Sequence, residues 1–588
     1  MPRKKTEIEN PLKGRNPCSK GVKDENIPAD KIEEQPQCHI HDKVEDDQVE
    51  NIRENVCVKE FDYPLIKHTD GKQYCLFHLP TKEKDTEKFE KFFKTRLNSV
   101  KEGIAKIKEL PKEECEEAKR LLSYDFRYVW FPSVNLMLYE FQVTANFGSA
   151  TFSSIAFFMS ATFSAYTDFS LARFLSLANF RAATFSSDAD FTAATFSAYS
   201  DFSAATFSSG TDFSSATFSA YADFDSATFL SDAYFGSARF FFIAYFGSAT
   251  FSANAFFIGT AFSAYVSFSA ATFLSDADFS KAKFEETSQI FFDQTSFQGV
   301  ADFRLAVVKG YLLFEAGEGK VFNGFDDEEM EPYYGKRMTD VFENRLEFAN
   351  IRAEKPERIT FNKVRLRPGW FVNVDSRKFV FTDIAWENYK ARKSELEEEL
   401  KSLTDRRYKE PHNYQLLTVS FRNLAANAEE FNRFEEASNF RKSASECERL
   451  ERLNRQKKSW REFKSEKGMS IPKLWRFIKT AQFDFVHFLY RWLSYYGENW
   501  LRAFGWLWVI WIVFAFGFFL LGEFGTEQNI EYLGFGKSFA YSLFVMTLQK
   551  PEPRSLSTIT YILYGLETIF APVQAALLAL AIRRKFMR

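Results

Sequence analysis

Two short motifs near the amino end combine cysteine with histidine, residue types that bind zinc. Cys38 and His41 form one Cys-x-x-His pair, and Cys75 and His78 form a second. Thiolate and imidazole are ligands that tetrahedral zinc prefers, and a gap of two residues lets both side chains of a pair reach one ion. The long interval between the two pairs matches no known finger spacing, so free cysteines of a cytosolic protein are the alternative. We predict one zinc ion at these four residues, and the sequence indicates no other cofactor.

A second group of polar residues lies on one face of an apolar segment near the carboxyl end. Glu567 is the only acidic or basic residue in residues 559–582, and Tyr564 and Gln574 lie on the same predicted helical face. A carboxyl group near the middle of a membrane costs at least ~2.5 kcal/mol, so we expect this stripe to face protein or water. Because one pair of helices cannot enclose such an interior, the stripe predicts self-association. It then either lines a cation pathway or bonds one helix to another.

Two long apolar segments position this stripe. Residues 503–522 contain no charged residue, and residues 559–582 contain only one, so each could cross a hydrocarbon core about 30 Å thick. Lysine and arginine concentrate before the first segment and after the second, whereas the loop 523–556 has four glutamates. The positive-inside rule therefore predicts two spans with both chain ends in the cytoplasm. The lipid bilayer is the first predicted partner.

A shorter apolar stretch lies between the two predicted spans. About 13 mostly apolar residues follow Lys537, too few to cross a membrane and too apolar for a free loop. This pattern predicts a re-entrant helix. Its polar residues Ser542 and Thr547, together with Gln549, are candidates for a pore lining or for hydrogen bonds to Glu567.

Phenylalanine spacing dominates the middle of the chain. From Phe147 to Phe303 the residue recurs after five and six positions alternately, with one slip after Phe284. An α-helix repeats its buried face at about 3.6 residues and a strand at 2, so neither explains the spacing. Four sides of five, six, five and six residues make a 22-residue coil that encloses the phenylalanines. The same step predicts one stacked column of threonines: Thr162, Thr184, Thr206, Thr228, Thr250 and Thr272.

This repeat resembles that of the pentapeptide-repeat family, whose members form a right-handed quadrilateral β-helix from A-x-F/L-x-x units. The chain departs from the strict form by one extra residue in every second unit. The segment from Trp500 to Arg588 resembles the two-span ion-channel module at the end of some bacterial pentapeptide-repeat membrane proteins. That resemblance implies a tetramer in the cytoplasmic (inner) membrane. Potassium channels carry a TVGYG filter, but this chain has Thr547-Leu548-Gln549-Lys550-Pro551 without glycine, so potassium selectivity is not expected.

Composition divides the 588-residue chain into several predicted segments. The start lacks the apolar region of a secretory signal, so we expect the part before the spans to be cytosolic. The predicted segments are a charged, largely disordered terminus (1–60), a candidate metal site with an amphipathic helical cap (61–140), the β-helix (141–305), an irregular β-helical extension (306–389), a TPR-like helical hairpin (390–470) and the membrane domain (471–588).

The sequence narrows the function classes. No phosphate-binding loop or hydrolase motif is present, so we predict neither an enzyme nor catalytic residues. A formal net charge of −3 offers no overall attraction to nucleic acid, although the stacked Asp168, Asp190, Asp212 and Asp278 keep DNA mimicry as one alternative. We predict an oligomeric ion-channel-like protein whose cytosolic part senses a signal, directs assembly or binds a cytosolic protein. The other alternative is a membrane-tethered scaffold that does not conduct.

Overall fold

The computed structural model describes residues 66–67, 73–80, 84–109, 111, 122–316, 341–403, 414–465, 488–526, 529–555 and 557–586. These fall into two compact units. The first comprises Met1–Leu366 and Lys378–Ala385, and the second comprises Arg367–Arg377 and Trp386–Arg588.

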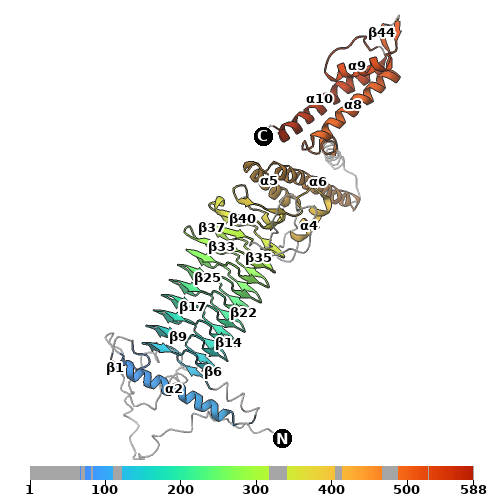
Figure 1. Cartoon of the computed structure of the whole chain (residues 1–588). Helices are drawn as coiled ribbons and strands as arrows, with labels where there is room; N and C mark the ends of the chain where they lie inside the picture. The colour runs from blue at the N-terminus through green and yellow to red at the C-terminus, as the bar shows by residue number, and fades with distance from the viewer. Residues whose placement is uncertain are drawn as a thin grey trace, which may run out of the picture. The chain divides into compact units, whose positions relative to one another are not determined.

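The first unit is a parallel β-solenoid of about 11 turns, whose stacked coils run from cyan to yellow-green in Figure 1. Each coil visits four sheets in turn, so the solenoid is four-sided. Sheet 1 extends from β3 (Tyr124–Asp125) to β38 (Arg345–Glu347), sheet 2 from β4 (Trp130–Phe131) to β39 (Arg352–Ala353), sheet 3 from β5 (Val134–Asn135) to β42 (Val380–Thr382), and sheet 4 from β6 (Glu140–Phe141) to β34 (Ser296–Phe297).

The strand register confirms the predicted coil length. In sheet 4, Thr162 pairs with Thr184 and Phe163 with Phe185, and the predicted threonine column continues to Thr272. The rings of Phe163 and Phe185 stack with centroids 4.7 Å apart. Every phenylalanine of the predicted five/six spacing is at most 1% exposed. The aromatic column therefore fills the solenoid, as the spacing predicts.

The alternation of five and six residues reflects two kinds of corner. A residue with positive φ recurs at every eleventh position, as at Ser160 and Leu171, and lies within the five-residue sides. Such a left-handed residue costs free energy unless local bonds support it. Outward aspartates supply these bonds: Asp168 Oδ1 accepts a hydrogen bond from the Ser170 amide at 2.7 Å. The same bond forms at Asp190, Asp201, Asp212 and Asp278.

The solenoid begins earlier than the expected boundary at residue 141. Its first coil starts at Tyr124, which pairs with Ala145, so this coil is one residue shorter than the regular ones. The buried Leu136 also takes a phenylalanine position, and both departures make the repeat harder to detect there. The phenylalanine spacing slips after Phe284, and the coil there is longer than the regular ones, because Val266 pairs with Ile290.

Helix α2 (Thr86–Ile107) covers the first coil of the solenoid. Asp85 caps the helix by accepting a hydrogen bond from the Lys88 amide at 3.1 Å. The Phe93 ring lies 5.1 Å from that of Phe126, and Phe89 also contacts the ring of Phe131. The helix therefore shields from water the aromatic core that the first coil would otherwise expose.

The second unit contains a 3₁₀ helix that lies in the chain before β42, and three α-helices that follow the solenoid. They are the 3₁₀ helix η5 (Pro368–Phe371), α4 (Lys393–Leu403), α5 (Tyr414–Glu430) and α6 (Phe434–Ser465). Helices α5 and α6 form a hairpin in which Phe421 contacts Phe440 with ring centroids 6.3 Å apart.

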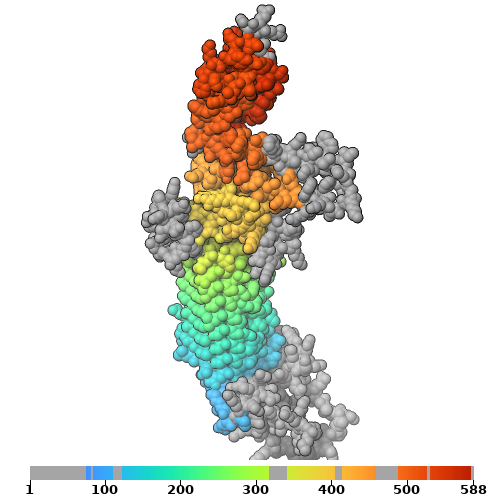
Figure 2. Space-filling model, turned by 90° about the vertical axis from the view of Figure 1, so that its right-hand side faces the viewer, coloured from blue at the N-terminus to red at the C-terminus, as the bar shows by residue number. Residues whose placement is uncertain are grey.

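Two further helices of this unit are long and apolar enough to cross a membrane: α8 (Trp500–Leu521) and α10 (Thr558–Phe586). Between them lie the hairpin β44 (Phe524–Thr526) and β45 (Asn529–Glu531), and then the short helix α9 (Phe535–Met546), coloured orange-red in Figures 1 and 2. Large apolar side chains are exposed along both long helices, including Leu501, Val513, Leu520, Ile562, Ile569 and Val573. Such a surface suits hydrocarbon.

Candidate functional site

The interior of the α8–α9–α10 bundle contains the polar stripe of α10. Helix α9 lies against both long helices. The Trp511 indole on α8 donates to the Phe539 carbonyl at 3.1 Å, and the Phe518 ring is 5.0 Å from that of Tyr541. An apolar cluster of Phe518, Phe524, Leu533, Tyr541 and Val545 closes one end of this interface. The expected re-entrant stretch is therefore a third packed helix.

Glu567 is fully buried at the centre of this bundle. The Ser542 hydroxyl on α9 is hydrogen-bonded to Glu567 Oε1, while Glu567 Oε2 has no hydrogen-bond partner. On the same face of α10, Thr560 Oγ1 accepts a bond from the Glu523 amide at 3.0 Å, and Gln574 Nε2 donates to the Ala503 carbonyl at 2.7 Å. The stripe thus bonds α10 to both of its neighbours.

One chain is enough to bury this stripe, which differs from the expectation that a single pair of spans cannot enclose it. Thr560 and Glu567 are 0% exposed and Gln574 is 1% exposed without a second copy. The reason is that α9 packs over Glu567, while α8 and Glu523 after it contact the other polar groups of the stripe. Burial of the stripe therefore gives no argument for self-association, and the predicted oligomer depends on other observations.

Two of the other candidate pore residues, Thr547 and Gln549, lie apart from Glu567. Tyr564 is partly buried beside the apolar cluster. Thr547 and Gln549 are exposed after the end of α9, where the Thr547 hydroxyl donates to the Leu543 carbonyl at 3.0 Å. Leu548 between them has a positive φ of 61°, a backbone conformation that usually favours glycine. The structure therefore brings Ser542 and Glu567 together and leaves Thr547 and Gln549 at the surface of the single chain.

A network of ion pairs joins α6 to the ends of both long helices. Glu498, just before α8, has a side chain only 3% exposed and pairs with Arg441 of α6 at 2.7 Å and with Arg584 of α10 at 3.0 Å. Ser438 of α6 donates to the same carboxylate at 2.8 Å. A buried ionised carboxylate without such partners would carry a large desolvation cost. Sequence reasoning missed Glu498 because no local motif marks it.

A second buried carboxylate strengthens this network of ion pairs between α6 and the two long helices, which we call the ion-pair joint. Glu446 of α6 pairs with Arg449 at 2.5 Å and accepts a hydrogen bond from the Tyr496 hydroxyl at 3.0 Å. Arg491 lies 3.4 Å from the same carboxylate. Burial and the neighbouring Glu446 charge raise the pKa of Tyr496, so its hydroxyl remains a donor. Helix α6 is therefore attached to the segment that enters α8 through two separate charge clusters.

Glu399 of α4 is a further buried acid in the second unit. Its carboxyl accepts hydrogen bonds from the Gly369 amide and from the Asn388 amide group, both at 2.9 Å. Burial raises the pKa of Glu399 to about 7, although these bonds and the Arg367 charge favour its ionised form. The group consequently changes charge near neutral pH.

The amino-terminal candidate metal site is described only in part. Cys75 Sγ lies 3.2 Å from His78 Nδ1, and His78 Nε2 lies 3.3 Å from the Arg127 carbonyl. The other predicted ligands, Cys38 and His41, lie outside the described residues. Among the residues with described positions, no group of three or more histidine, cysteine or acidic side chains could hold a metal ion. Cys75 and His78, the two members of one Cys-x-x-His pair, are therefore adjacent. Zinc binding stays a prediction.

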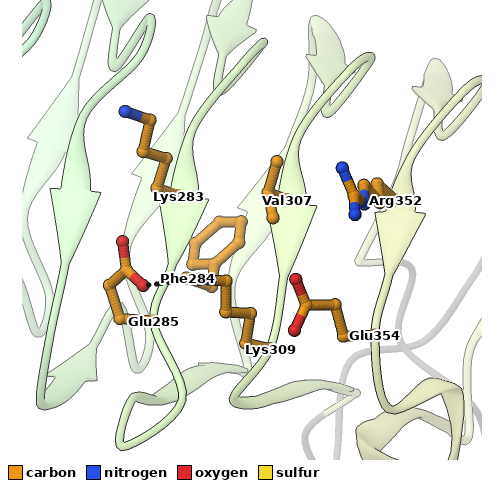
Figure 3. Close-up of a pocket in the computed structure, with 7 residues that line it drawn as sticks. All are labelled: Lys283, Phe284, Glu285, Val307, Lys309, Arg352 and Glu354. Atoms are coloured by element: carbon orange, nitrogen blue, oxygen red, sulfur yellow. Dashed lines mark hydrogen bonds and ion pairs between the residues drawn. The ribbon is translucent and has the colours of Figure 1, made fainter.

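A shallow hollow of about 280 Å³ lies on sheet 2 of the solenoid (Figure 3). Lys283 and Arg352 project from strands of this sheet on either side of Val307. Lys309 pairs with Glu285 at 3.3 Å, and Glu354 adds a second carboxylate. Acidic and basic groups nearly balance, so the hollow offers no strong selectivity for an anion.

Comparison with known proteins assigns the chain to no family. No family model matches it, and neither a curated protein nor a solved structure does. The likeness to pentapeptide-repeat proteins thus depends on the repeat alone, which the structure contains as about 11 coils with a spacing of about 22 residues. A repeat β-solenoid followed by two apolar helices suggests a membrane-associated repeat protein.

Proposed function

We propose that the protein is an oligomeric ion-conducting membrane protein whose cytosolic β-solenoid and helical hairpin sense a signal or direct assembly. The proposal depends mainly on one observation. A short helix, α9, is fastened between two long apolar helices by the Trp511–Phe539 and Ser542–Glu567 hydrogen bonds. Span, re-entrant helix and span is the layout of channels whose ion path follows the short helix. No catalytic role is part of the proposal.

The exposed end of α9 supports an assembly of several copies. Leu543, Phe544 and Leu548 are 43–62% exposed in one chain. Irregular backbone at membrane depth is tolerated only where protein covers it or where it borders water. Other copies of the chain supply that cover, and the segment Thr547–Gln549 then borders the path. Without glycine in this segment, the path does not have the backbone of a potassium filter.

The ion-pair joint supports a sensing role for the cytosolic part. Glu498 binds Arg441 of α6 and Arg584 of α10 at once, so displacement of α6 acts on the cytoplasmic ends of both spans. The predicted topology, with both chain ends in the cytoplasm of a bacterial cell, places this joint at the inner face of the inner membrane.

Flux through the purified full chain in liposomes tests the proposal. We expect cation flux above that of empty liposomes, and a marked loss when Gln549→Arg places a positive charge beside the proposed path. Tyr532→Arg is the matched control, because Tyr532 is 71% exposed in the segment before α9 and lies outside that path. Native mass spectrometry in mild detergent should find several copies.

Absence of flux from correctly inserted protein would instead favour the membrane-tethered scaffold. One observation supports that alternative: the polar stripe of α10 is buried within a single chain, as an anchor would require. DNA mimicry lacks comparable support, because the stacked aspartates cap the solenoid corners.

A further inference from the structure

Glu567 has no counter-charge inside the membrane module. The Ser542 hydroxyl is its hydrogen-bond partner, and Oε2 is unpartnered. The neighbouring titratable side chains are phenols: Tyr541 of α9 interacts electrostatically with Glu567 and with Tyr564 of α10, whereas Tyr561 is 59% exposed. Trp511–Phe518 of α8 contains no titratable residue. No ion pair involves Glu567 among the residues that the structure describes. A lone carboxylate at this depth is unstable, so a cation from outside the chain must neutralise it.

The hydrogen bonds around Ser542 indicate which cation this is. A serine hydroxyl carries one proton, yet two acceptors lie within its reach: Glu567 Oε1 and the Trp511 carbonyl, the latter at 3.3 Å. A proton on the carboxyl resolves the conflict. Glu567 then donates to Ser542 Oγ, and Ser542 donates to the Trp511 carbonyl. This directed chain connects α10, α9 and α8.

A metal cation fits the same place poorly. Calcium takes six to eight oxygen ligands and magnesium six. Here the oxygens are those of Glu567, the Ser542 hydroxyl and the Trp511 carbonyl. Neighbouring side chains are mainly apolar, as Phe514, Phe518 and Val545 illustrate. The ligand set is too small for either of these divalent ions and sufficient for a proton.

We propose that Glu567 is a proton-binding site whose proton holds α9 against α8 and α10, so that release of the proton loosens α9. The consequence for conduction rests on the proposed function, because α9 leads directly into the segment that borders the proposed ion path. Loss of the proton leaves a carboxylate among apolar side chains, and it must then attract water or a mobile cation. Proton binding and the position of α9 are therefore linked.

Infrared difference spectroscopy of the full chain in lipid nanodiscs tests the site directly. In a Glu399→Gln background, which removes the other carboxyl that titrates near neutral pH, we expect a protonated carboxyl C=O band at neutral pH that Glu567→Gln abolishes. Glu531→Gln, an exposed glutamate outside the bundle, is the matched control and should keep the band. Ser542→Ala should shift the band to higher wavenumber, because the hydrogen bond to the carboxyl is lost. Titration to alkaline pH should abolish the band in wild-type protein.

Two outcomes would overturn the proton site. The first is carboxylate bands alone at neutral pH, and the second is a carboxyl band that survives Glu567→Gln in the Glu399→Gln background. If Glu567→Gln fails to assemble, mass spectrometry of wild-type protein treated with dicyclohexylcarbodiimide replaces it. This apolar reagent modifies protonated carboxyls, so labelling of Glu567 that falls as pH rises supports the site, and unlabelled Glu567 refutes it. These measurements do not involve flux, so failure of the proposed conduction is detected separately.

Discussion

Replacement of one core phenylalanine tests the solenoid most directly. Phe207 is fully buried and stacks on Phe185 at 4.9 Å and on Phe229 at 4.8 Å. Phe207→Ala removes both stacks and leaves a cavity, which typically costs about 3–5 kcal/mol. Phe207→Asp adds the cost of a buried, unpaired charge and should unfold the surrounding coils. The outward neighbour Thr206 is the matched control, because Thr206→Ala leaves the core unchanged.

Hydrogen exchange with mass spectrometry, on the full chain, measures this effect locally. Coils of a solenoid contact only their neighbours, so the loss of protection against exchange should concentrate around residues 185–229. A cost of about 3–5 kcal/mol corresponds to exchange faster by roughly two to three and a half orders of magnitude. Thr206→Ala should change exchange by less than about tenfold. If the residues around position 207 exchange as slowly in Phe207→Ala as in the wild type, and the protein remains folded, the aromatic core is not the source of the stability.

Four further predictions concern other parts of the chain. A reporter active only outside the cytoplasm should stay silent when fused after Arg588, and a signal from it would contradict the topology. Metal analysis of a reduced fragment 1–130 should find about one zinc per chain, whereas a ratio near zero would end the zinc prediction. Because burial raises the folded pKa of Glu399 to about 7, the native state binds a proton that the unfolded state has lost. The free energy of unfolding should therefore fall as pH rises from about 4.5 to 7, and Glu399→Gln should remove that slope; a slope equal to that of the wild type would exclude Glu399 as its source. Finally, Glu498→Gln should lower thermal stability by about 3 kcal/mol, since it weakens the pairing of Arg441 within the joint; an unchanged melting curve would contradict a structural role.

Much of the solenoid follows from the sequence because its repeat is local. Phenylalanine at alternate steps of five and six positions determines which side chains point inward, and the constant coil length then fixes which strands pair. The first coil escaped prediction because it lacks one residue and carries Leu136 in a phenylalanine position. Positive φ at the corners was also invisible in the sequence, since serine, alanine and leucine occupy those positions as well as glycine.

The two long apolar helices also followed from composition, because length and the absence of charge are enough to predict them. The alignment of Glu567 with Gln574 followed from helical periodicity. What faces this stripe depended on the tertiary structure. Helix α9 packs against it, Ser542 meets Glu567 across 25 positions of the chain, and the interior closes within one copy.

The joint between the helical hairpin and the two long apolar helices was decided by tertiary structure alone. Glu498 lies 57 positions from Arg441 and 86 from Arg584, and nothing in the local sequence distinguishes it from other glutamates. Periodicity reports which face of an element is buried, because burial repeats with the geometry of that element. It carries no information about which distant charge will meet a buried carboxylate, since that depends on how whole helices pack.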